Sequence, residues 1–295
     1  MNIITIFKQF PDQESCIKYL EQKRWNNKPI CPYCQSDNTN PLKSENRFRH
    51  HCNGCRKSFS VTIGTIFHDS RLPLQKWFLA IALILNAKKG ISSRQMARDL
   101  DLPVKTAWSI NHRIRKAMMQ DTGLLSGIIE MDETYVGDKP RKEAKKKDKD
   151  GNDDDKGNTR GRATKKECVV GMIERGGKVK AETVKKIDSF KLCELVRKNA
   201  DRNSSTLMTD EFRGYNLMRY LLNHLKINYQ EAFAVGEIHT NTIENFWAIL
   251  KRGMIGQFHK VSKKYLNAYI DEFCWRFNER KNGNAFDKLV GNILK

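Results

Sequence analysis

Three acidic residues between positions 132 and 244 of the chain could bind divalent metal together. Asp132 lies within a β-prone run, IIEMDETYV, and Asp210 closes a second such run, TLMTDEF. Glu244 stands near the start of an amphipathic segment, NTIENFWAILKRG. Converging carboxylates bind hard divalent cations, and two such ions about 4 Å apart can activate the attacking oxygen and stabilise the leaving oxygen in phosphodiester chemistry. The three acids are therefore a candidate metal-dependent site.

Neighbouring residues leave alternatives open at each of these positions. Glu130, Glu133 and Glu211 flank the two aspartates, and strand alternation puts Glu130 on the same face as Asp132, with Glu133 opposite. Glu244 also has a simpler reading as part of a helix start, because NTIE fits a variant capping box. In that box Asn241 caps the helix and the glutamate reaches back from its third position.

The cysteines point to a second, different metal site. Four of the eight form two C-x-x-C pairs, Cys31 with Cys34 and Cys52 with Cys55, which are seventeen residues apart. This spacing is typical of a four-cysteine zinc site, in which each pair supplies two thiolates to one tetrahedral ion. We expect one structural zinc in a ribbon, and we expect His50 and its neighbour to be surface residues because four thiolates fill the shell.

The segment GISSRQMARDLDLPVKTAWSINHRIRKAM has the shape of a helix-turn-helix. A serine, Ser92 or Ser93, caps the first helix and the turn lies near Pro103. In the second helix, Val104 and Trp108 are expected to face the core with Ala107 and Ile114. The outward residues, where a recognition helix would meet DNA, are Lys105, Thr106, Ser109 and Arg113. Exposed helix surface explains these four residues equally well.

Composition favours a polyanionic partner. Lys and Arg total 54 against 34 Asp and Glu, a formal net charge of +20. Such an excess suits DNA, since neutralising phosphates releases condensed counterions. The longest apolar run is too short to span a bilayer and the N-terminus lacks the pattern of a secretory signal. We therefore expect a cytoplasmic protein associated with the nucleoid and no membrane partner.

The predicted helices and strands divide the chain into three regions. Residues 1–70 hold a helix over 12–25 and the zinc ribbon, and residues 71–122 hold helices. From 123 to 295 the pattern of strand, hairpin, helix and strand followed by helices indicates a mixed α/β domain. A run rich in both charges, about 138–167, should be a solvated insertion in that domain.

Taken together, the motifs resemble the DDE-type transposases of bacterial insertion sequences, in the subgroup with an N-terminal zinc ribbon. The resemblance covers nearly the whole chain, through the helix ending in KRW before CPYC, then CNGC, MDETYVG, TDEFRGY, HTNTIENFWAILKRGMIGQFHKVS and YLNAYIDEFCWRFNER. It implies a ribonuclease-H-like (retroviral-integrase-like) α/β catalytic domain and two catalytic Mg²⁺ or Mn²⁺ ions. It also implies DNA cleavage at terminal inverted repeats and strand transfer to target DNA.

The resemblance further assigns roles to residues. Asp132, Asp210 and Glu244 become the catalytic metal ligands, and Lys251, two helical turns after the glutamate, becomes a DNA contact. Related groups sometimes carry asparagine or histidine in place of the third acid, which makes Asn241 and His239 alternatives to Glu244 as the third catalytic residue.

The predicted DNA contacts also include Arg252, next to Lys251. The resemblance implies double-stranded DNA, at the element ends and at the target, as the partner. The resemblance implies at least a dimer on DNA.

Two other functions remain open. A zinc-ribbon and helix-turn-helix regulator without catalysis would explain the charge and the cysteines, but not the three acids. An inactive or domesticated copy of a transposase would keep all the motifs.

Overall fold

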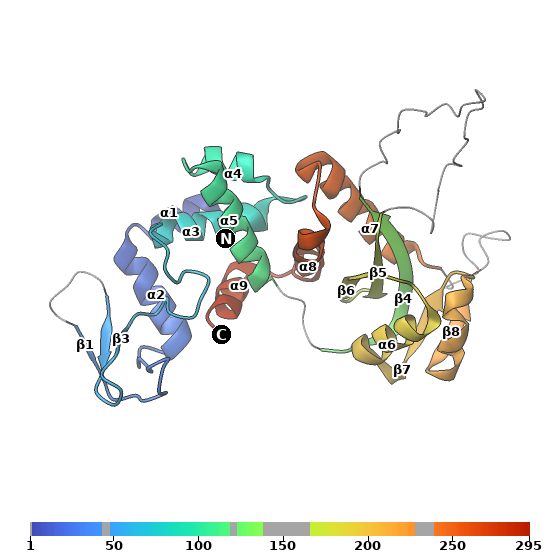
Figure 1. Cartoon of the computed structure of the whole chain (residues 1–295), viewed down its shortest axis with the longest axis horizontal. Helices are drawn as coiled ribbons and strands as arrows, with labels where there is room; N and C mark the ends of the chain where they lie inside the picture. The colour runs from blue at the N-terminus through green and yellow to red at the C-terminus, as the bar shows by residue number, and fades with distance from the viewer. Residues whose placement is uncertain (1, 43–47, 119–122, 138–165, 228–238) are drawn as a thin grey trace, which may run out of the picture. The chain divides into compact units, whose positions relative to one another are not determined.

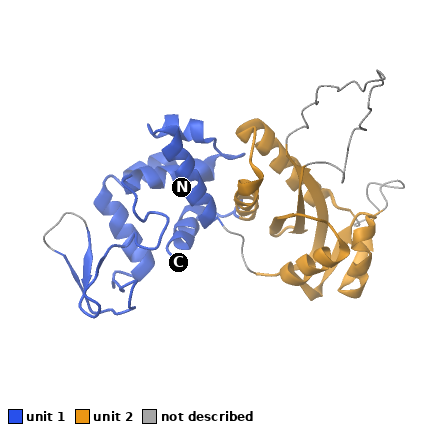
Figure 2. Cartoon of the chain, viewed as in Figure 1, with its two compact units in different colours: residues 1–119, 279–295 blue, residues 120–278 orange. Residues whose placement is uncertain are grey.

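The computed structural model describes residues 2–42, 48–118, 123–137, 166–227 and 239–295 (Figure 1). The chain divides into two compact units: unit 1 is Met1–Met119 with Glu279–Lys295, and unit 2 is Gln120–Asn278 (Figure 2). The charged insertion expected at 138–167 lies outside the described residues except for its last two. Within the described ranges, no helix has the length and apolar character needed to cross a membrane.

Unit 1 begins with two helices and a small antiparallel sheet. The helices are α1 (Ile3–Gln9) and α2 (Gln13–Trp25), and the sheet has the order β1 (Thr39–Pro41), β2 (His50–Cys52), β3 (Ser58–Phe59). The predicted helix over 12–25 is confirmed. Its start is fixed by Asp12, whose carboxylate accepts the backbone N–H of Ser15 at 2.7 Å while the Ser15 side chain bonds back to the Asp12 backbone.

The remaining helices of unit 1 are α3 (Leu74–Asn86), α4 (Ser93–Asp99), α5 (Val104–Ala117) and α9 (Ala285–Ile293). The α/β domain was expected to run to residue 295, whereas unit 2 ends at Asn278 and residues 279–295 belong to unit 1. The apolar stripe of α9 packs instead in unit 1, where the Phe286 ring lies 5.6 Å from Phe78 and 6.4 Å from Phe10. A short amphipathic helix does not specify its partner, because any apolar surface can bury its stripe.

Unit 2 is built on a five-stranded sheet in the order β6-β5-β4-β7-β8. Its strands are β4 (Leu125–Val136), β5 (Glu167–Glu174), β6 (Val179–Val184), β7 (Ala200–Thr209) and β8 (Asn223–Lys226). The first three pair antiparallel, and β7 runs parallel to β4 after the crossover helix α6 (Ser189–Asn199). The expected mixed α/β class is confirmed, and the predicted hairpin is β5–β6.

Helices cover both faces of this sheet. One face carries α6 and the 3₁₀ helix η2 (Arg213–Tyr220), packed on Ile129 and Met131 of β4. The other carries α7 (Asn241–Gly253) and α8 (Leu266–Asn278), joined by a π-helical turn (Met254–Phe258) and a 3₁₀ turn (Lys263–Tyr265). Since successive side chains alternate along β4, Glu130 and Asp132 belong to the α7 face.

Candidate functional site: a four-cysteine cluster and paired aspartates under helix α7

The two cysteine pairs sit in turns of the same construction. In the first, Gln35 donates its N–H to the Cys31 carbonyl at 2.9 Å, and Cys31 donates to the Ser36 carbonyl at 2.9 Å. The turn at Cys52 repeats both bonds, at 2.8 and 3.0 Å. The residue after its second cysteine is again left-handed, with φ of 59° at Arg56 against 61° at Gln35. Both pairs therefore aim their sulfurs alike.

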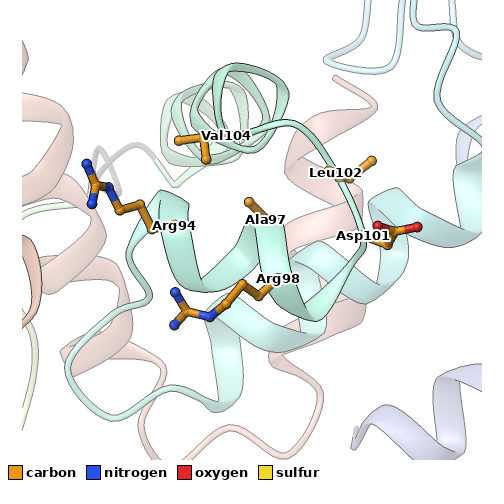
Figure 3. A pocket seen from close by; sticks show the side chains of 6 residues that line it. All are labelled: Arg94, Ala97, Arg98, Asp101, Leu102 and Val104. Carbon is orange, nitrogen blue, oxygen red and sulfur yellow. The ribbon is translucent and has the colours of Figure 1, made fainter.

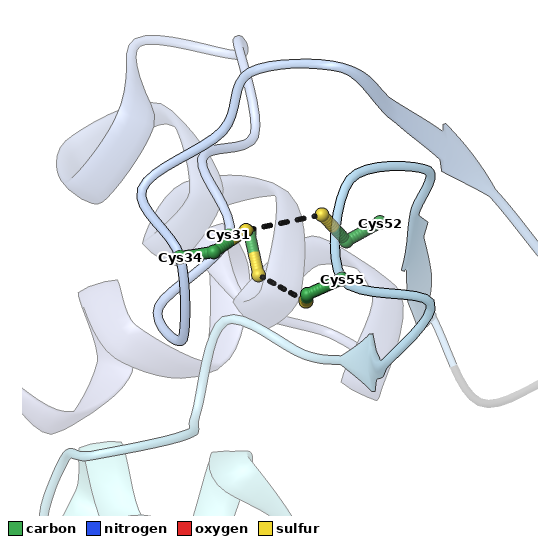
Figure 4. Close-up of side chains that lie close together, drawn as sticks. All are labelled: Cys31, Cys34, Cys52 and Cys55. Atoms are coloured by element: carbon green, nitrogen blue, oxygen red, sulfur yellow. Dashed lines mark hydrogen bonds between the residues drawn. The ribbon is translucent and has the colours of Figure 1, made fainter.

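The four sulfurs form one cluster (Figure 4). Their Sγ atoms lie within 4.8 Å of one another, with Cys31 to Cys55 at 3.6 Å and Cys34 to Cys52 at 3.5 Å. Sulfurs on a tetrahedral zinc with bonds of about 2.3 Å are about 3.8 Å apart, so the cluster fits one zinc ion. The backbone N–H of Cys55 directed at Cys52 lowers the pKa of that thiol to about 7, which favours the ligating thiolate.

One histidine beside the cluster holds the ribbon to α2. His50 lies 2.8 Å from Glu21 through Nε2, and its ring contacts Trp25 and Phe59 at centroid distances of 5.8 and 5.6 Å. The expectation of a surface residue was wrong for His50, because the strand β2 turns this side chain onto the helix. Its role is packing rather than metal binding.

In unit 2, neighbouring parallel strands bring Asp132 and Asp210 together. Glu130 of β4 is in register with Met208 of β7, and each aspartate lies two residues further along its strand direction. Adjacent strands are about 4.8 Å apart, so the two carboxylates share one end of the β4–β7 pair. Asp210 itself follows the end of β7, where its Oδ1 accepts the N–H of Phe212 at 3.0 Å.

The electrostatics of Asp132 reflect this crowding. Burial first, and then the like charge of Glu133 with a smaller effect of Asp210, raise the pKa of Asp132 to about 7. Glu133 points to the opposite face of the sheet, as strand alternation predicts, and accepts the phenol hydroxyl of Tyr215 at 2.8 Å. A carboxyl with this environment is typical of a site that gains from a bound cation.

Helix α7 reaches Asp132 directly. The indole Nε1–H of Trp247 donates to Asp132 Oδ2 at 3.0 Å. This approach requires Gly171, which is in register with Asp132 on β5, because a Cβ there would lie 2.5 Å from the Trp247 ring. Neither residue was predicted to be part of the site; the glycine inside a strand pattern was the available signal.

Glu244 lies on α7, one turn before Trp247, and its side chain is exposed. Its Oε1 accepts the hydroxyl of Thr240 at 3.1 Å. The alternative reading of a capping box at Asn241 is not borne out, because the helix begins at Asn241 and its N-cap is Thr240, which makes no side-chain cap bond. Asn241 is exposed at the helix start.

The three acids are not closed into one cluster. Among the described residues, the only group of three or more candidate ligands within 4.8 Å is the cysteine set. The structure thus pairs Asp132 with Asp210 and puts Glu244 on the helix that contacts Asp132. The role of the three acids as metal ligands stays a prediction.

Glu130 has a defined role that the sequence analysis did not foresee. Its carboxylate is fully buried and accepts the backbone N–H groups of Thr242 and Ile243 at the start of α7. His239, an alternative for the third acid, lies 3.3 Å from the same carboxylate through Nδ1.

The predicted DNA contacts lie on exposed helix ends and one helix face. Lys251 and Arg252 are exposed in the last turn of α7. In unit 1, α4 and α5 flank a hollow of about 620 Å³, lined by Arg94, Ala97, Arg98, Asp101, Leu102 and Val104 (Figure 3). Lys105 and Ser109 are exposed on α5, whereas Thr106 is half-buried.

Three residues of α5 lie differently from expectation. Val104 is 50% and Trp108 41% exposed, so their assignment to the core was wrong. The buried stripe passes through Ala107, and Trp108 is one residue, about 100°, further round the helix. Arg113 donates to the carbonyl of His68 at 2.8 Å, which disfavours its predicted DNA contact.

Asp132→Asn is expected to stabilise the protein at alkaline pH. The unfolded carboxyl loses its proton near 3.8 and the folded one near 7, so between these values the folded state binds more protons and the free energy of unfolding falls as pH rises. At pH 8 the variant should gain up to about 4 kcal/mol, and about half of this at pH 5.5. Urea unfolding without added divalent ions measures it. A neutral or destabilising effect at pH 8 would contradict the raised pKa.

The comparisons with known proteins agree with this combination of modules. Residues 124–278 match the family described as the ISXO2-like transposase domain, and residues 11–58 match the transposase zinc-ribbon domain. The chain thus combines a transposase zinc ribbon with a transposase domain. Since the first match spans more than half of the chain, the protein belongs to the ISXO2-like transposase family. The resemblance noted from the sequence is confirmed.

Two relatives support the same family. An "Uncharacterized protein in transposable element ISH50" of Halobacterium salinarum is 28% identical over 277 residues, which cover 91% of this chain and 92% of that protein. An "Uncharacterized transposase-like protein" of Haemophilus influenzae is 31% identical over 119 residues, 40% of this chain and 91% of that protein.

Solved structures show only a weak likeness. The Mos1 transposase paired-end complex with left transposon end gives a TM-score of 0.28 at 12% identity, covering 73% of this chain and 78% of that chain. The pre-cleavage Mos1 transpososome gives 0.27 at 14% identity, with the same coverage. Scores this low do not establish a shared fold.

Proposed function

We propose that this protein is an active transposase that binds the terminal inverted repeats of its element, cleaves the DNA there and joins the freed ends to target DNA. The observation that carries the proposal is the pairing of Asp132 and Asp210 at the end of two parallel strands, with α7 bonded to Asp132 through Trp247. Membership in a transposase family supports DNA as the substrate class.

In this proposal Asp132, Asp210 and Glu244 hold two Mg²⁺ or Mn²⁺ ions. Such ions supply Lewis acidity at the attacking and leaving oxygens of a phosphodiester. The two aspartates provide the paired oxygens of the site, and Glu244 completes it from α7. The indole of Trp247 orients the Asp132 carboxylate by donating to its Oδ2.

The strand order supports a ribonuclease-H-like catalytic domain within unit 2. Three antiparallel strands are followed by a crossover helix and two parallel strands, in the order β6-β5-β4-β7-β8. The first aspartate on the central strand and the second after the neighbouring strand are the positions that the resemblance implies.

DNA binding is proposed for both units. The excess of basic residues provides non-specific attraction to phosphates. On unit 1, Lys105, Thr106 and Ser109 of α5 are the proposed contacts of a helix-turn-helix. On unit 2, Lys251 and Arg252 would meet DNA near the reacting end. At least a dimer would join two DNA ends, and the zinc would fold the ribbon.

The test is a cleavage and joining assay. Purified protein is incubated with labelled duplexes that carry the two ends of its own element, a target plasmid and Mg²⁺. Nicks at the element boundary and joined products are expected, and both should disappear when Mg²⁺ is omitted.

The same assay separates the alternatives. A regulator of the zinc-ribbon and helix-turn-helix type would retard the labelled ends in a gel without producing nicks in Mg²⁺ or Mn²⁺. A domesticated copy would give the same negative result and would also lack flanking inverted repeats. Binding without any product would therefore reject the catalytic proposal.

A further inference from the structure

A buried glutamate ties the catalytic face of the sheet to the start of α7. Glu130 is 0% exposed. Its Oε2 accepts the N–H groups of Thr242 and Ile243 at 2.8 and 3.0 Å, and its Oε1 accepts the Thr242 hydroxyl at 2.9 Å. The same Oε1 accepts Nε–H of Arg175 at 2.7 Å. Every one of these donors comes from a segment far from Glu130 in sequence.

These bonds replace the cap that α7 lacks. The first N–H groups of a helix have no partner within it, and the N-terminal end of the helix dipole attracts negative charge. Thr240, the N-cap residue, makes no side-chain cap bond. The carboxylate of Glu130 therefore caps the helix from strand β4, and the helix end in turn offsets the cost of burying its charge.

Arg175 extends this attachment across the sheet, and we call Glu130 and Arg175, with their bonds to the start of α7, the clamp. Arg175 lies in the β5–β6 turn, and its Nη2 donates to the carbonyl of His239, just before α7, at 2.9 Å. The same nitrogen contacts Sδ of Met208 on β7 at 3.1 Å. Its own backbone N–H bonds to the carbonyl of Ile128 on β4 at 2.9 Å. One side chain thus joins β4, β7 and the entry to α7.

The clamp is two residues from the proposed metal ligands on both elements. Glu130 precedes Asp132 on the same face of β4, and Thr242 precedes Glu244 on α7. A second bond, from Trp247 to Asp132, fixes α7 one turn further on. Glu244 lies between these two attachment points, so a movement of the helix start changes its distance from Asp132.

We propose that Glu130 and Arg175 are positioning residues that set the separation of Glu244 from Asp132 and so determine the affinity of the site for divalent metal. This inference rests on the proposed function, because it needs the three acids to be metal ligands. Neither residue touches substrate in this proposal. Outer groups that orient metal ligands typically contribute about 10–100-fold to metal affinity.

A buried ion pair could instead serve stability alone, and unit 2 offers a matched control for that role. Glu272 of α8 is also 0% exposed, and it pairs with Arg276 at 3.4 Å. It is the same residue type in the same unit, and this ion pair lies within α8, four residues apart. Glu272→Gln should therefore destabilise the unit without changing the metal site.

The first measurement is made without metal, by NMR on the full zinc-loaded chain. Glu130→Gln keeps the shape of the side chain but replaces one acceptor oxygen with a donor. We expect faster hydrogen exchange at the amides of Thr242 and Ile243 and a shifted indole resonance of Trp247, assigned with Trp247→Phe. Glu272→Gln should leave all three signals unchanged.

The second measurement adds Mg²⁺ and follows the same indole resonance. In the wild type the resonance should move as metal binds Asp132, and Asp132→Asn should abolish the response. Glu130→Gln should need a Mg²⁺ concentration at least about tenfold higher for the same response, whereas Glu272→Gln should match the wild type. Where Glu130→Gln does not fold, Thr242→Val removes only the hydroxyl bond and should shift the titration less, in the same direction.

The outcomes are distinct. A wild-type response with unchanged titrations in Glu130→Gln and Thr242→Val overturns the positioning role and leaves the proposed metal site standing. No wild-type response at any Mg²⁺ concentration overturns the metal site itself, and with it the positioning role. Equal losses of metal affinity in Glu130→Gln and Glu272→Gln would show a general effect of stability and also reject the inference.

Discussion

Asp132→Ala and Asp210→Ala are each expected to lower metal-dependent DNA cleavage by roughly 10³-fold or more. Metal ions contribute several kcal/mol of charge stabilisation in phosphoryl transfer, and each 1.36 kcal/mol is about tenfold in rate. Either change removes half of the carboxylate pair at the β4–β7 end, so one ion would lose its position. Single-turnover cleavage of a labelled element end in Mg²⁺ measures the effect.

DNA binding separates this loss from misfolding. Because the aspartates are acidic, their removal should leave gel retardation of the element ends nearly unchanged. Glu244→Ala should lower DNA cleavage as the two aspartate variants do. Glu211→Ala is the matched control, since this exposed acid directly follows Asp210 and should keep wild-type cleavage. Wild-type cleavage by Asp210→Ala, together with loss in Glu211→Ala, would move the second ligand by one residue.

Cys52→Ser is expected to remove the bound zinc and unfold the ribbon. A structural zinc contributes about 10–16 kcal/mol to folding in zinc-finger peptides, far more than strands of two or three residues can supply. Metal analysis should fall from about one zinc per chain to near zero. Limited proteolysis should then cut within the segment that follows α2, where Trp25 loses its packing against His50 and Phe59.

Cys193→Ala supplies the control for the loss of a thiol. This free cysteine is buried in the core of unit 2 and is not one of the four clustered cysteines, so its loss should leave the zinc content unchanged. Retention of a full equivalent of zinc by Cys52→Ser would show that three cysteines and another ligand suffice, which would contradict a closed four-cysteine site.

Sequence reasoning located most elements, because their signals are local. Asp12 and Ser92 mark helix starts that the structure confirms through their bonds to backbone N–H groups three residues on. The zinc site was equally predictable, since its ligands come from two short turns with fixed spacing. The strand β8 gave no clear signal, as four residues with little apolar character do not form a recognisable period.

The functional face was only partly predictable. The strand pattern placed Asp132 within one strand and Asp210 at the end of a later one, whereas their pairing depends on the parallel register of β4 and β7. Trp247 was assigned to packing, and it does pack, but its indole N–H also bonds to Asp132. A period in sequence shows which face is apolar, not which polar atom it meets.

The sequence by itself determined the zinc ribbon, the mixed α/β class and the family, since cysteine spacing, caps, alternation and motifs are local features. Only the tertiary structure decided that Glu130 caps α7 from 112 residues away, and that the last helix belongs to unit 1. The physical reason is the same in both cases. A buried charge and an apolar stripe each require a partner, but many partners would satisfy them, and the choice is made only when distant segments pack together.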